Sequence, residues 1–385
     1  MERLWTKSFL LITTATLFLF TAFYMLYPTL PPFIKQIGGN ESLVGWATGV
    51  FMLSAVLVRP LVGGLLDRFG RRPFLLGGVL LFAAVMYGYS WIGGIAVLLA
   101  LRTVHGVSWA VSTTSMLTAA ADMIPPTRRG EGMGWFGTAM TVAMAVGPMI
   151  GLAVAKNTSY QGLFLFATFL SVLAFVLLIP VDMPFQRQRE AKRIDFWEPS
   201  VLPVAVSVIF LFLAYGGITT FVPLFAESIH VNSGLFFLVY AAALMLSRPL
   251  AGKLSDRRGE AAVIGPALAT TVLALLLLSI SKGWVEFFSA AVLFGIGFGS
   301  AQPALQAAMI RMARPDRIGV ANATFTTATD LGIGFGAILF GWISTHMGYS
   351  AVFRCSALAV VVSFVVFIVF RKRMAANDRS RSLTA

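Results

Sequence analysis

The number and length of the apolar stretches limit the fold more than any other feature of this sequence. A helix needs ~20 residues to cross a bilayer, and about twelve stretches are long enough to do so. They cover residues 8–34, 41–66, 74–93, 95–123, 132–156, 160–181, 200–228, 234–254, 261–281, 284–311, 317–345 and 350–371. The chain is 58% hydrophobic and 12% charged, whereas soluble domains are about half apolar and a quarter charged. The excess must face lipid, where a backbone has to satisfy its own hydrogen bonds, so we predict an all-α membrane protein with twelve transmembrane helices.

The composition also argues against several classes of site. The one cysteine, Cys355, lies in an apolar stretch, so we expect no disulfide framework and no cysteine-based metal site. The net charge of +13 could suggest nucleic-acid binding. The basic residues are split among short loops between apolar stretches, so we expect no nucleic-acid partner. No phosphate-binding loop pattern occurs, so we do not expect ATP to be the energy source. We also expect no cofactor and no metal.

The distribution of lysine and arginine predicts the topology, because cytoplasmic loops carry an excess of both. Of the 29 such residues, 22 lie at the termini or in every second loop. Three lie in the opposite loops or at their edge (Lys35, Lys156 and Lys282), and the other four lie further inside the spans (Arg59, Arg102, Arg248 and Arg354). The first segment is too long for a signal peptide and has no small-residue cleavage site, so we keep it as a helix. We therefore predict a multi-pass protein of the cell inner (plasma) membrane with both termini cytoplasmic.

A polar break divides the chain into two similar halves. We predict an N-terminal six-helix bundle over 1–181, a cytoplasmic linker over 182–199, a C-terminal six-helix bundle over 200–371 and a cytoplasmic tail over 372–385. The halves match at a constant offset of 189 residues, as Arg59 and Arg248 illustrate. Internal repeats of this size are typical of secondary transporters, whose substrate site lies between the halves near the midplane.

A charged corner follows the second apolar stretch and recurs in the second half. It comprises Gly63, Asp67, Arg68, Gly70, Arg71 and Arg72, and the recurrence comprises Gly252, Asp256, Arg257 and Gly259. The first corner matches the G-x-x-x-D-R-x-G-R-R motif of the major facilitator superfamily in full, and the chain resembles that family over essentially its whole length.

Two further motifs point to one branch of that family. Arg102, His105 and Gly106 are similar to its R-x-x-Q-G motif, with histidine in place of glutamine. The fifth stretch is similar to the G-x-x-x-G-P-x-x-G motif of antiporting exporters, with Ala143 at the first glycine; the matching residues are Gly147, Pro148 and Gly151. Together they resemble the twelve-helix drug:proton antiporters.

The resemblance implies that the charged corner is a conformational latch. It places helix 2 beside helix 11, so Asp67 would meet the positive end of a helix dipole, and Arg71 can reach Asp122. The glycines would let backbones approach closely, and the latch would favour the state that is open outward. We expect the second latch to be weaker, because Glu260 follows its last glycine and Arg311 stands where Asp122 would be. The alternative is that these residues only satisfy the positive-inside rule.

The fourth stretch carries the main candidates for substrate and proton. Arg102, His105, Trp109 and Thr113 share one helical face. A charge within a membrane span is a functional hypothesis by default, and histidine, with a reference pKa of ~6.5, suits proton exchange near neutral pH. The alternative is that His105 simply hydrogen-bonds a neighbouring helix.

Asp330 is the deepest acidic residue in the chain. Its repeat counterpart, near Thr141 or Val142, is uncharged, so the fold itself does not require the acid. Asp330 could titrate as a coupling site or form a buried ion pair with Arg59, and both can be true. Glu227, at the outer end of its helix, is a further candidate that we expect to be interfacial.

Aromatic and amide side chains could shape a mostly apolar pocket with few polar groups. The candidates are Tyr24, Tyr27, Trp109, Tyr215, Phe221, Gln302 and Gln306. Taken singly, each aromatic could equally face lipid or pack between helices. The first helix lacks the acid that many drug:proton antiporters carry, which weakens any expected preference for cationic drugs.

These patterns predict a secondary transporter and not an enzyme. We expect it to export a small amphipathic molecule in exchange for protons by alternating access, as a monomer in the lipid bilayer. One alternative is a proton-coupled transporter of a metabolite such as a sugar, an amino-acid derivative or a siderophore. Another is a non-transporting receptor or scaffold, which would predict an added soluble domain.

Overall fold

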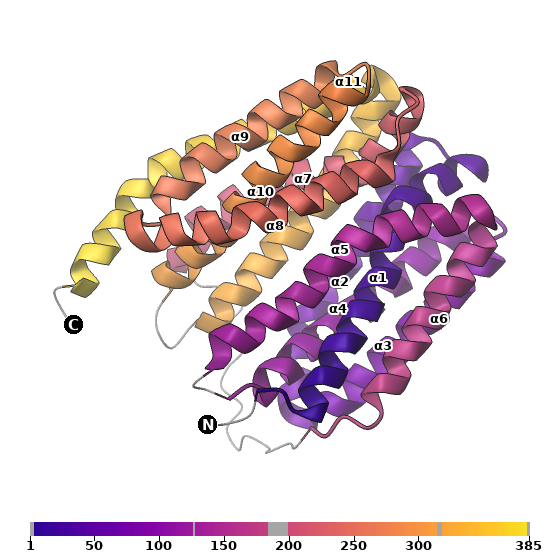
Figure 1. Cartoon of the computed structure of the whole chain (residues 1–385), viewed down its shortest axis with the longest axis horizontal. Coiled ribbons are helices and arrows are strands. Elements are labelled where there is room, and N and C mark those ends of the chain that lie inside the picture. The colour runs from indigo at the N-terminus through magenta and orange to yellow at the C-terminus, as the bar shows by residue number, and fades with distance from the viewer. Residues whose placement is uncertain (1–3, 126–127, 184–198, 314–317, 383–385) are drawn as a thin grey trace. The chain divides into compact units, whose positions relative to one another are not determined.

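The computed structural model describes residues 4–125, 128–183, 199–313 and 318–382, and these residues form helices joined by short connections. The helices are α1 (Lys7–Gln36), α2 (Glu41–Phe69), α3 (Arg71–Gly88), η1 (Tyr89–Trp91), α4 (Ile95–Met123), α5 (Arg129–Asn157), α6 (Tyr160–Leu178), η3 (Pro199–Val201), α7 (Leu202–Ser228), α8 (Ser233–Arg258), α9 (Ala261–Ile280), α10 (Trp284–Met312) and α11 (Ile318–Ser382) (Figure 1). The side chains of Asp67 and Asp256, and those from residue 371 onward, lie outside the described part.

The long helix α11 comprises two membrane-crossing segments. Its 65 residues would span about 98 Å as one straight helix, about three times the ~30 Å hydrocarbon core of a bilayer. The helix breaks at Gly348, whose φ of 77° and ψ of 174° are not helical. With this break, the described helices supply twelve crossing segments, which confirms the predicted all-α membrane fold. The helix continues to Ser382, whereas its apolar part ends at Phe370.

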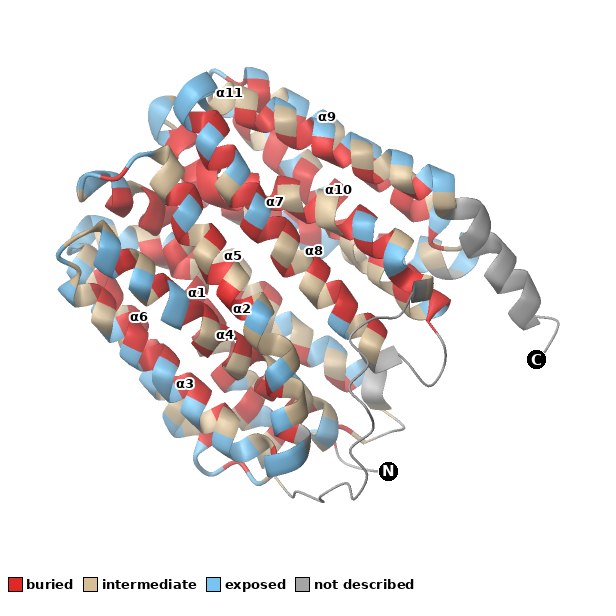
Figure 2. Ribbon diagram, turned by 180° about the vertical axis from the view of Figure 1, so that it is seen from behind, coloured by how far each residue is buried: buried red, intermediate tan, exposed pale blue. Residues whose placement is uncertain are grey.

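The chain forms two compact units. The first comprises Met1–Leu43 and Val50–Ile194, and the second comprises Val44–Gly49 and Asp195–Ala385. Most of the expected linker, residues 184–198, lies outside the described residues. Within each unit, buried residues follow the helix faces that pack on neighbouring helices, while the outer faces are exposed (Figure 2). Large exposed apolar side chains such as Leu57, Leu80 and Leu246 suit a surface that faces lipid.

Glycines set the closest helix contacts of the first unit. A Cβ added at Gly147 would lie 2.7 Å from Tyr24 Cβ, and one at Gly151 would lie 2.9 Å from Met25 Cα. These two residues of the antiporter-type motif therefore let α5 approach α1, as small residues do in membrane helix pairs. A Cβ at Gly106 would collide with the Phe51 carbonyl, which brings α4 against α2.

The second unit repeats these contacts at the same offset. Gly295, the counterpart of Gly106, packs on the Tyr240 carbonyl, and Tyr240 is the counterpart of Phe51. Gly336, the counterpart of Gly147, packs against Leu213, which is the counterpart of Tyr24. The internal repeat that the sequence predicts thus extends to individual helix contacts.

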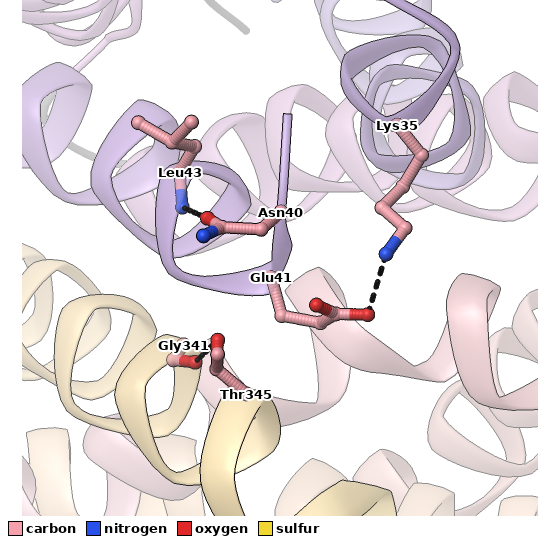
Figure 3. A network of polar contacts seen from close by, with 6 residues as sticks. All are labelled: Lys35, Asn40, Glu41, Leu43, Gly341 and Thr345. Carbon is pink, nitrogen blue, oxygen red and sulfur yellow. Dashed lines mark hydrogen bonds and ion pairs between the residues drawn. The ribbon is translucent and has the colours of Figure 1, made fainter. Parts of the chain in front are cut away.

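Side-chain hydrogen bonds secure the helix ends and turns (Figure 3). Asn40 caps α2 by accepting the backbone N–H of Leu43 at 3.0 Å. Lys35 Nζ lies 2.6 Å from Glu41 Oε1 and so joins the end of α1 to the start of α2. In α11, the Thr345 hydroxyl donates to the Gly341 carbonyl at 2.9 Å, a local bond that satisfies the hydroxyl within its own helix.

Candidate substrate and proton-coupling site

Four polar or aromatic residues of α4 form a buried row in the first unit. Arg102 is 5% exposed, His105 is fully buried, and Trp109 and Thr113 are also buried. Their spacing places them on one face, as predicted. A guanidinium held at this depth is costly to bury, so it requires partners from the surrounding helices.

Arg102 and Tyr89 both face one nitrogen of His105. The Tyr89 hydroxyl lies 2.9 Å from His105 Nδ1, and Arg102 Nη1 lies 3.4 Å from the same atom. Tyr89 is buried and comes from η1, the short turn between α3 and α4. The Arg102 guanidinium also lies over the ring of Phe51 on α2, 4.3 Å from its centroid. We call Tyr89, Arg102 and His105 the outer polar cluster.

Aromatic rings surround the outer polar cluster. The His105 ring lies 4.9 Å from Phe51 and 4.8 Å from Phe82, in edge-on contacts. One turn further along α4, Trp109 stacks on Phe23 of α1 at 3.9 Å and 19°. Flat aromatic faces therefore pack around one buried cation in the first unit.

The second unit has an apolar version of the same arrangement. The residues 189 positions after Tyr89, Arg102 and His105 are Leu278, Ala291 and Phe294, and all three are buried. Phe294 packs on Tyr240 at 5.5 Å, as His105 packs on Phe51. The helix packing thus does not need the charge or the histidine, which favours a functional reason for the outer polar cluster.

Two arginines lie deeper in the spans and have equivalent partners. Arg59 Nη1 donates to the hydroxyls of Thr113 and Thr114, at 3.2 Å and 3.3 Å. Arg248 Nη2 donates to Gln302 Oε1 at 3.2 Å, and these two residues are the counterparts of Arg59 and Thr113. Gln302 therefore serves as a partner for an arginine.

The remaining candidates lie in different surroundings. Asp330 on α11 is 5% exposed, whereas Glu227 is exposed in the last turn of α7. Gln306 Nε2 donates to Asn322 Oδ1 at 3.4 Å, across α10 and α11. Tyr215 stacks on Phe298 at 4.6 Å and 12°, in the second unit.

The aromatic candidates of α1 are partly buried, and Phe221 is fully buried. Tyr24 and Tyr27 pack edge-on at 5.1 Å. Among the described residues, no three metal-ligating side chains gather at one place.

The chain matches one protein family over most of its length. The model of the Major Facilitator Superfamily matches residues 12–337 and 204–384. The chain belongs to the major facilitator superfamily. It is therefore a multi-pass membrane transporter of small molecules and not an enzyme.

Named relatives span nearly its full length. The staphylopine export protein of Staphylococcus aureus is 24% identical over 386 residues, which cover 94% of this chain and 95% of that protein. The multidrug resistance protein MdtG of Escherichia coli is 25% identical over 383 residues, which cover 94% and 93%. A solved bacterial homologue of the lysosomal transporter Spinster shares the fold, with a TM-score of 0.76, 14% identity and 96% coverage of each chain.

A glycine with a positive φ angle forms the turn at each charged corner of this transporter. Gly70 has φ 88° and Gly259 has φ 80°, a region that side-chain-bearing residues rarely adopt. Each connects two helices that are almost continuous in sequence. At Gly63 and Gly252, by contrast, an added Cβ would meet no described atom within 4 Å. Within its own unit, neither glycine therefore packs closely on a neighbouring helix among the described residues.

An ion pair ties the helix ends together at each corner. In the first unit, Arg71 Nε lies 2.9 Å from Asp122 Oδ2, which is the contact expected from the sequence. In the second unit, Arg311 Nη2 lies 2.6 Å from Glu260 Oε1. Glu260 and Arg311 are the counterparts of Arg71 and Asp122. The two residues that we interpreted as departures from the motif thus form the same contact with the charges exchanged.

The exchange changes how each pair relates to the helix dipoles. Glu260 precedes the N-terminus of α9, and Arg311 lies in the last turn of α10, so both charges are favourable. Arg71 begins α3 and Asp122 is near the end of α4, so both are unfavourable there. Arg71 also donates to the Leu66 carbonyl at 3.0 Å, which offsets part of this cost.

We therefore predict that Glu260→Gln destabilises the protein more than Asp122→Asn. Each change removes one ion pair, worth ~0–1 kcal/mol. Glu260→Gln also removes a favourable dipole interaction of ~0.3–1 kcal/mol, whereas Asp122→Asn removes an unfavourable one. The melting temperatures of the two purified variants should differ by a few degrees, with Glu260→Gln the lower. An equal or reversed order would contradict the dipole argument.

Tyr89 is the residue of the outer polar cluster that the sequence analysis missed. It lies near the end of the third apolar stretch, where a tyrosine is common at a membrane interface. A comparison of the halves would have revealed it, because tyrosine stands opposite leucine there, as Arg102 stands opposite alanine.

Proposed function

We propose that this transporter exports a small amphipathic compound in exchange for protons, by alternating access. The observation that carries the proposal is the outer polar cluster, a buried cation with hydrogen-bonding partners inside an aromatic wall. The second unit builds the same packing without polar groups. Buried charge that the fold does not need is the usual mark of a substrate or proton pathway.

The relatives support export more than uptake. One is named for the export of staphylopine and another for multidrug resistance. A metabolite-specific transporter is the second candidate, and the relative named for a single exported metabolite favours it. The two candidates differ in selectivity, because an aromatic wall with few polar groups tolerates varied ligands, whereas a hydrogen-bonding site rejects analogues that lack its partners.

In this proposal the substrate contacts the aromatic wall and the protons use buried polar groups. Trp109 and Tyr24 supply flat faces, and Arg102 holds an acceptor group or stabilises an acid. Asp330 is the proposed proton carrier, since it is a buried acid in a membrane span. We also propose a monomer with both termini cytoplasmic and with functional halves at 1–181 and 200–371.

A binding screen tests the selectivity directly. The purified transporter would be heated with ethidium, with 8-anilinonaphthalene-1-sulfonate and with N-phenyl-1-naphthylamine, which are a cation, an anion and a neutral dye. A ligand that binds only the folded state raises the melting temperature. Broad export predicts stabilisation by at least two of the three dyes. Stabilisation by none of them, together with stabilisation by a single metabolite from a library, would favour the metabolite-specific alternative.

We further propose that the first charged corner acts as a latch, and we predict that Asp67→Asn weakens it. The neutral amide loses the attraction to a helix N-terminus, which is worth ~0.3–1 kcal/mol. We expect more inward-open protein and slower transport at normal expression. Distances between spin labels at Ile179 and Arg258, both exposed, would measure the shift after the native cysteine is replaced.

Asp182→Asn is the matched control, because Asp182 is an exposed acid outside the motif. It should leave the distance distribution unchanged. An unchanged distribution and normal transport in Asp67→Asn would rule out the latch.

A further inference from the structure

We propose that His105 and Tyr89 are positioning residues for Arg102, and that His105 acts as a neutral hydrogen-bond acceptor rather than as the proton carrier. The proposal rests on the proposed function, since it assigns roles within the same site. It concerns contacts inside the first unit alone.

The donors around His105 determine which ring nitrogen carries hydrogen. A guanidinium has only donors, and Arg102 Nη1 faces Nδ1 at 3.4 Å. The Tyr89 hydroxyl reaches the same atom at 2.9 Å. Nδ1 must therefore accept, and the neutral ring carries its hydrogen on Nε2. A second ring proton would have to occupy Nδ1, directly against the cation.

The guanidinium of Arg102 is thus held from two directions. His105, on the same helix, accepts from its edge, and Phe51 of α2 lies under its face at 4.3 Å. Tyr89 bonds the acceptor and fixes the orientation of the imidazole ring, because a ring held at one nitrogen by two groups cannot rotate freely. The side chain of Arg102 is consequently set by residues of α2, η1 and α4 together.

A histidine at position 105 lowers the stability of the fold, and packing alone does not explain why a histidine is used there. The Nε2 atom is buried and has no hydrogen-bond partner among the described residues. A buried polar atom without a partner is destabilising. Phenylalanine, which the second unit uses at position 294, would fill the space without that cost. Histidine is therefore explained by the acceptor that it offers to Arg102.

Among the described side chains, no acid faces His105 to favour its protonation. The titratable or charged side chains against it are Tyr89 and Arg102. The elements packed on the ring otherwise present aromatic side chains, namely Phe23 from α1, Phe51 from α2 and Phe82 from α3.

Two substitutions of His105 separate positioning from proton transfer. Glutamine keeps an oxygen acceptor but cannot titrate, whereas phenylalanine removes the acceptor and copies the second unit. Uptake of the three dyes into acidic-inside proteoliposomes would be measured between about pH 5.5 and 8, a range that brackets the ordinary histidine pKa. We expect His105→Gln to keep the wild-type pH profile and His105→Phe to lose about tenfold or more in rate. Tyr89→Phe should fall between them.

The effects of substitutions at His105 and Arg102 on the transport rate should be non-additive, which a merely structural role of His105 would not predict. If His105 acts through Arg102, then His105→Phe should cost clearly less in an Arg102→Lys background that retains partial transport than it costs in the wild type, because lysine has fewer donors to position. Full additivity would overturn the positioning role. Loss of all pH-gradient-driven uptake in His105→Gln, with normal folding, would also overturn it and would identify His105 as the proton carrier.

A spectroscopic test does not depend on transport at all. The chain has three histidines, and the other two, His230 and His346, are exposed. Replacing both with asparagine leaves His105 as the single signal in protein labelled with 15N-histidine. We expect one neutral tautomer, protonated at Nε2, throughout the same pH range. A titrating signal, or hydrogen on Nδ1, would overturn the proposal even if no dye is transported.

Discussion

Replacing Arg102 with alanine is expected to abolish transport driven by a pH gradient. The guanidinium is the buried cation of the outer polar cluster, and alanine would leave the site without its charge and without its donors. In the proposed mechanism the guanidinium donates two charge-assisted hydrogen bonds to the transported compound or to an acid, and losing two such bonds of ~1.5 kcal/mol each corresponds to a loss of about a hundredfold or more in rate. Lysine should restore transport only in part, because a single ammonium cannot reproduce the several donors of the planar group.

Arg354→Ala is the matched control for this prediction. Arg354 is also an arginine within a predicted span, but it is exposed and lies outside the site. The control should transport at close to the wild-type rate. Rates of dye uptake in proteoliposomes would be compared at equal amounts of folded protein. Wild-type rates in Arg102→Ala would reduce Arg102 to a packing role.

Asp330→Asn is expected to uncouple transport from the pH gradient while leaving the fold intact. The amide resembles the protonated acid, so it can occupy the same buried position on α11 without a charge. The variant should still be stabilised by a dye that binds the wild type, but its uptake should no longer respond to an imposed gradient. Melting temperature and gradient-driven uptake measure the two effects separately.

The same variant tests the alternative role of Asp330 as a partner of Arg59. If the two form a buried pair, Asp330→Asn leaves an uncompensated arginine and costs ~3–5 kcal/mol. Neutralising both residues should then recover much of the lost stability. Arg59 has the hydroxyls of Thr113 and Thr114 as acceptors, so we expect the single variant to fold. Normal stability with normal proton-coupled uptake would contradict both roles.

The helices and the repeat could be predicted because both depend on local sequence patterns. A lipid-facing helix needs an unbroken apolar stretch, so its ends are visible as polar or glycine-rich residues. Helices α4, α8 and α9 accordingly begin or end within a few residues of the predicted bounds. The break at Gly348 could be predicted for the same reason, because this glycine lies in the short segment between two apolar stretches.

The contacts within the candidate site were harder to predict because they join residues far apart in the sequence. Tyr89 reaches His105 across a turn, and nothing in its local pattern indicates a partner. In the sequence, Glu260 and Arg311 each differ in charge from the residue at the equivalent position of the first half, and neither difference by itself indicates a partner. The structure brings the two helix ends together, and there the two residues form an ion pair.

In the proposed mechanism, an outward flow of protons drives uptake of an amphipathic compound through the site around Arg102. Proteoliposomes with an acidic interior would be diluted into neutral buffer that contains the three dyes, and dye accumulation would be followed by fluorescence. The account predicts accumulation by the wild type that stops when an ionophore collapses the gradient, and no accumulation by Arg102→Ala. Accumulation that is the same with and without the gradient, or the same in Arg102→Ala, would contradict it.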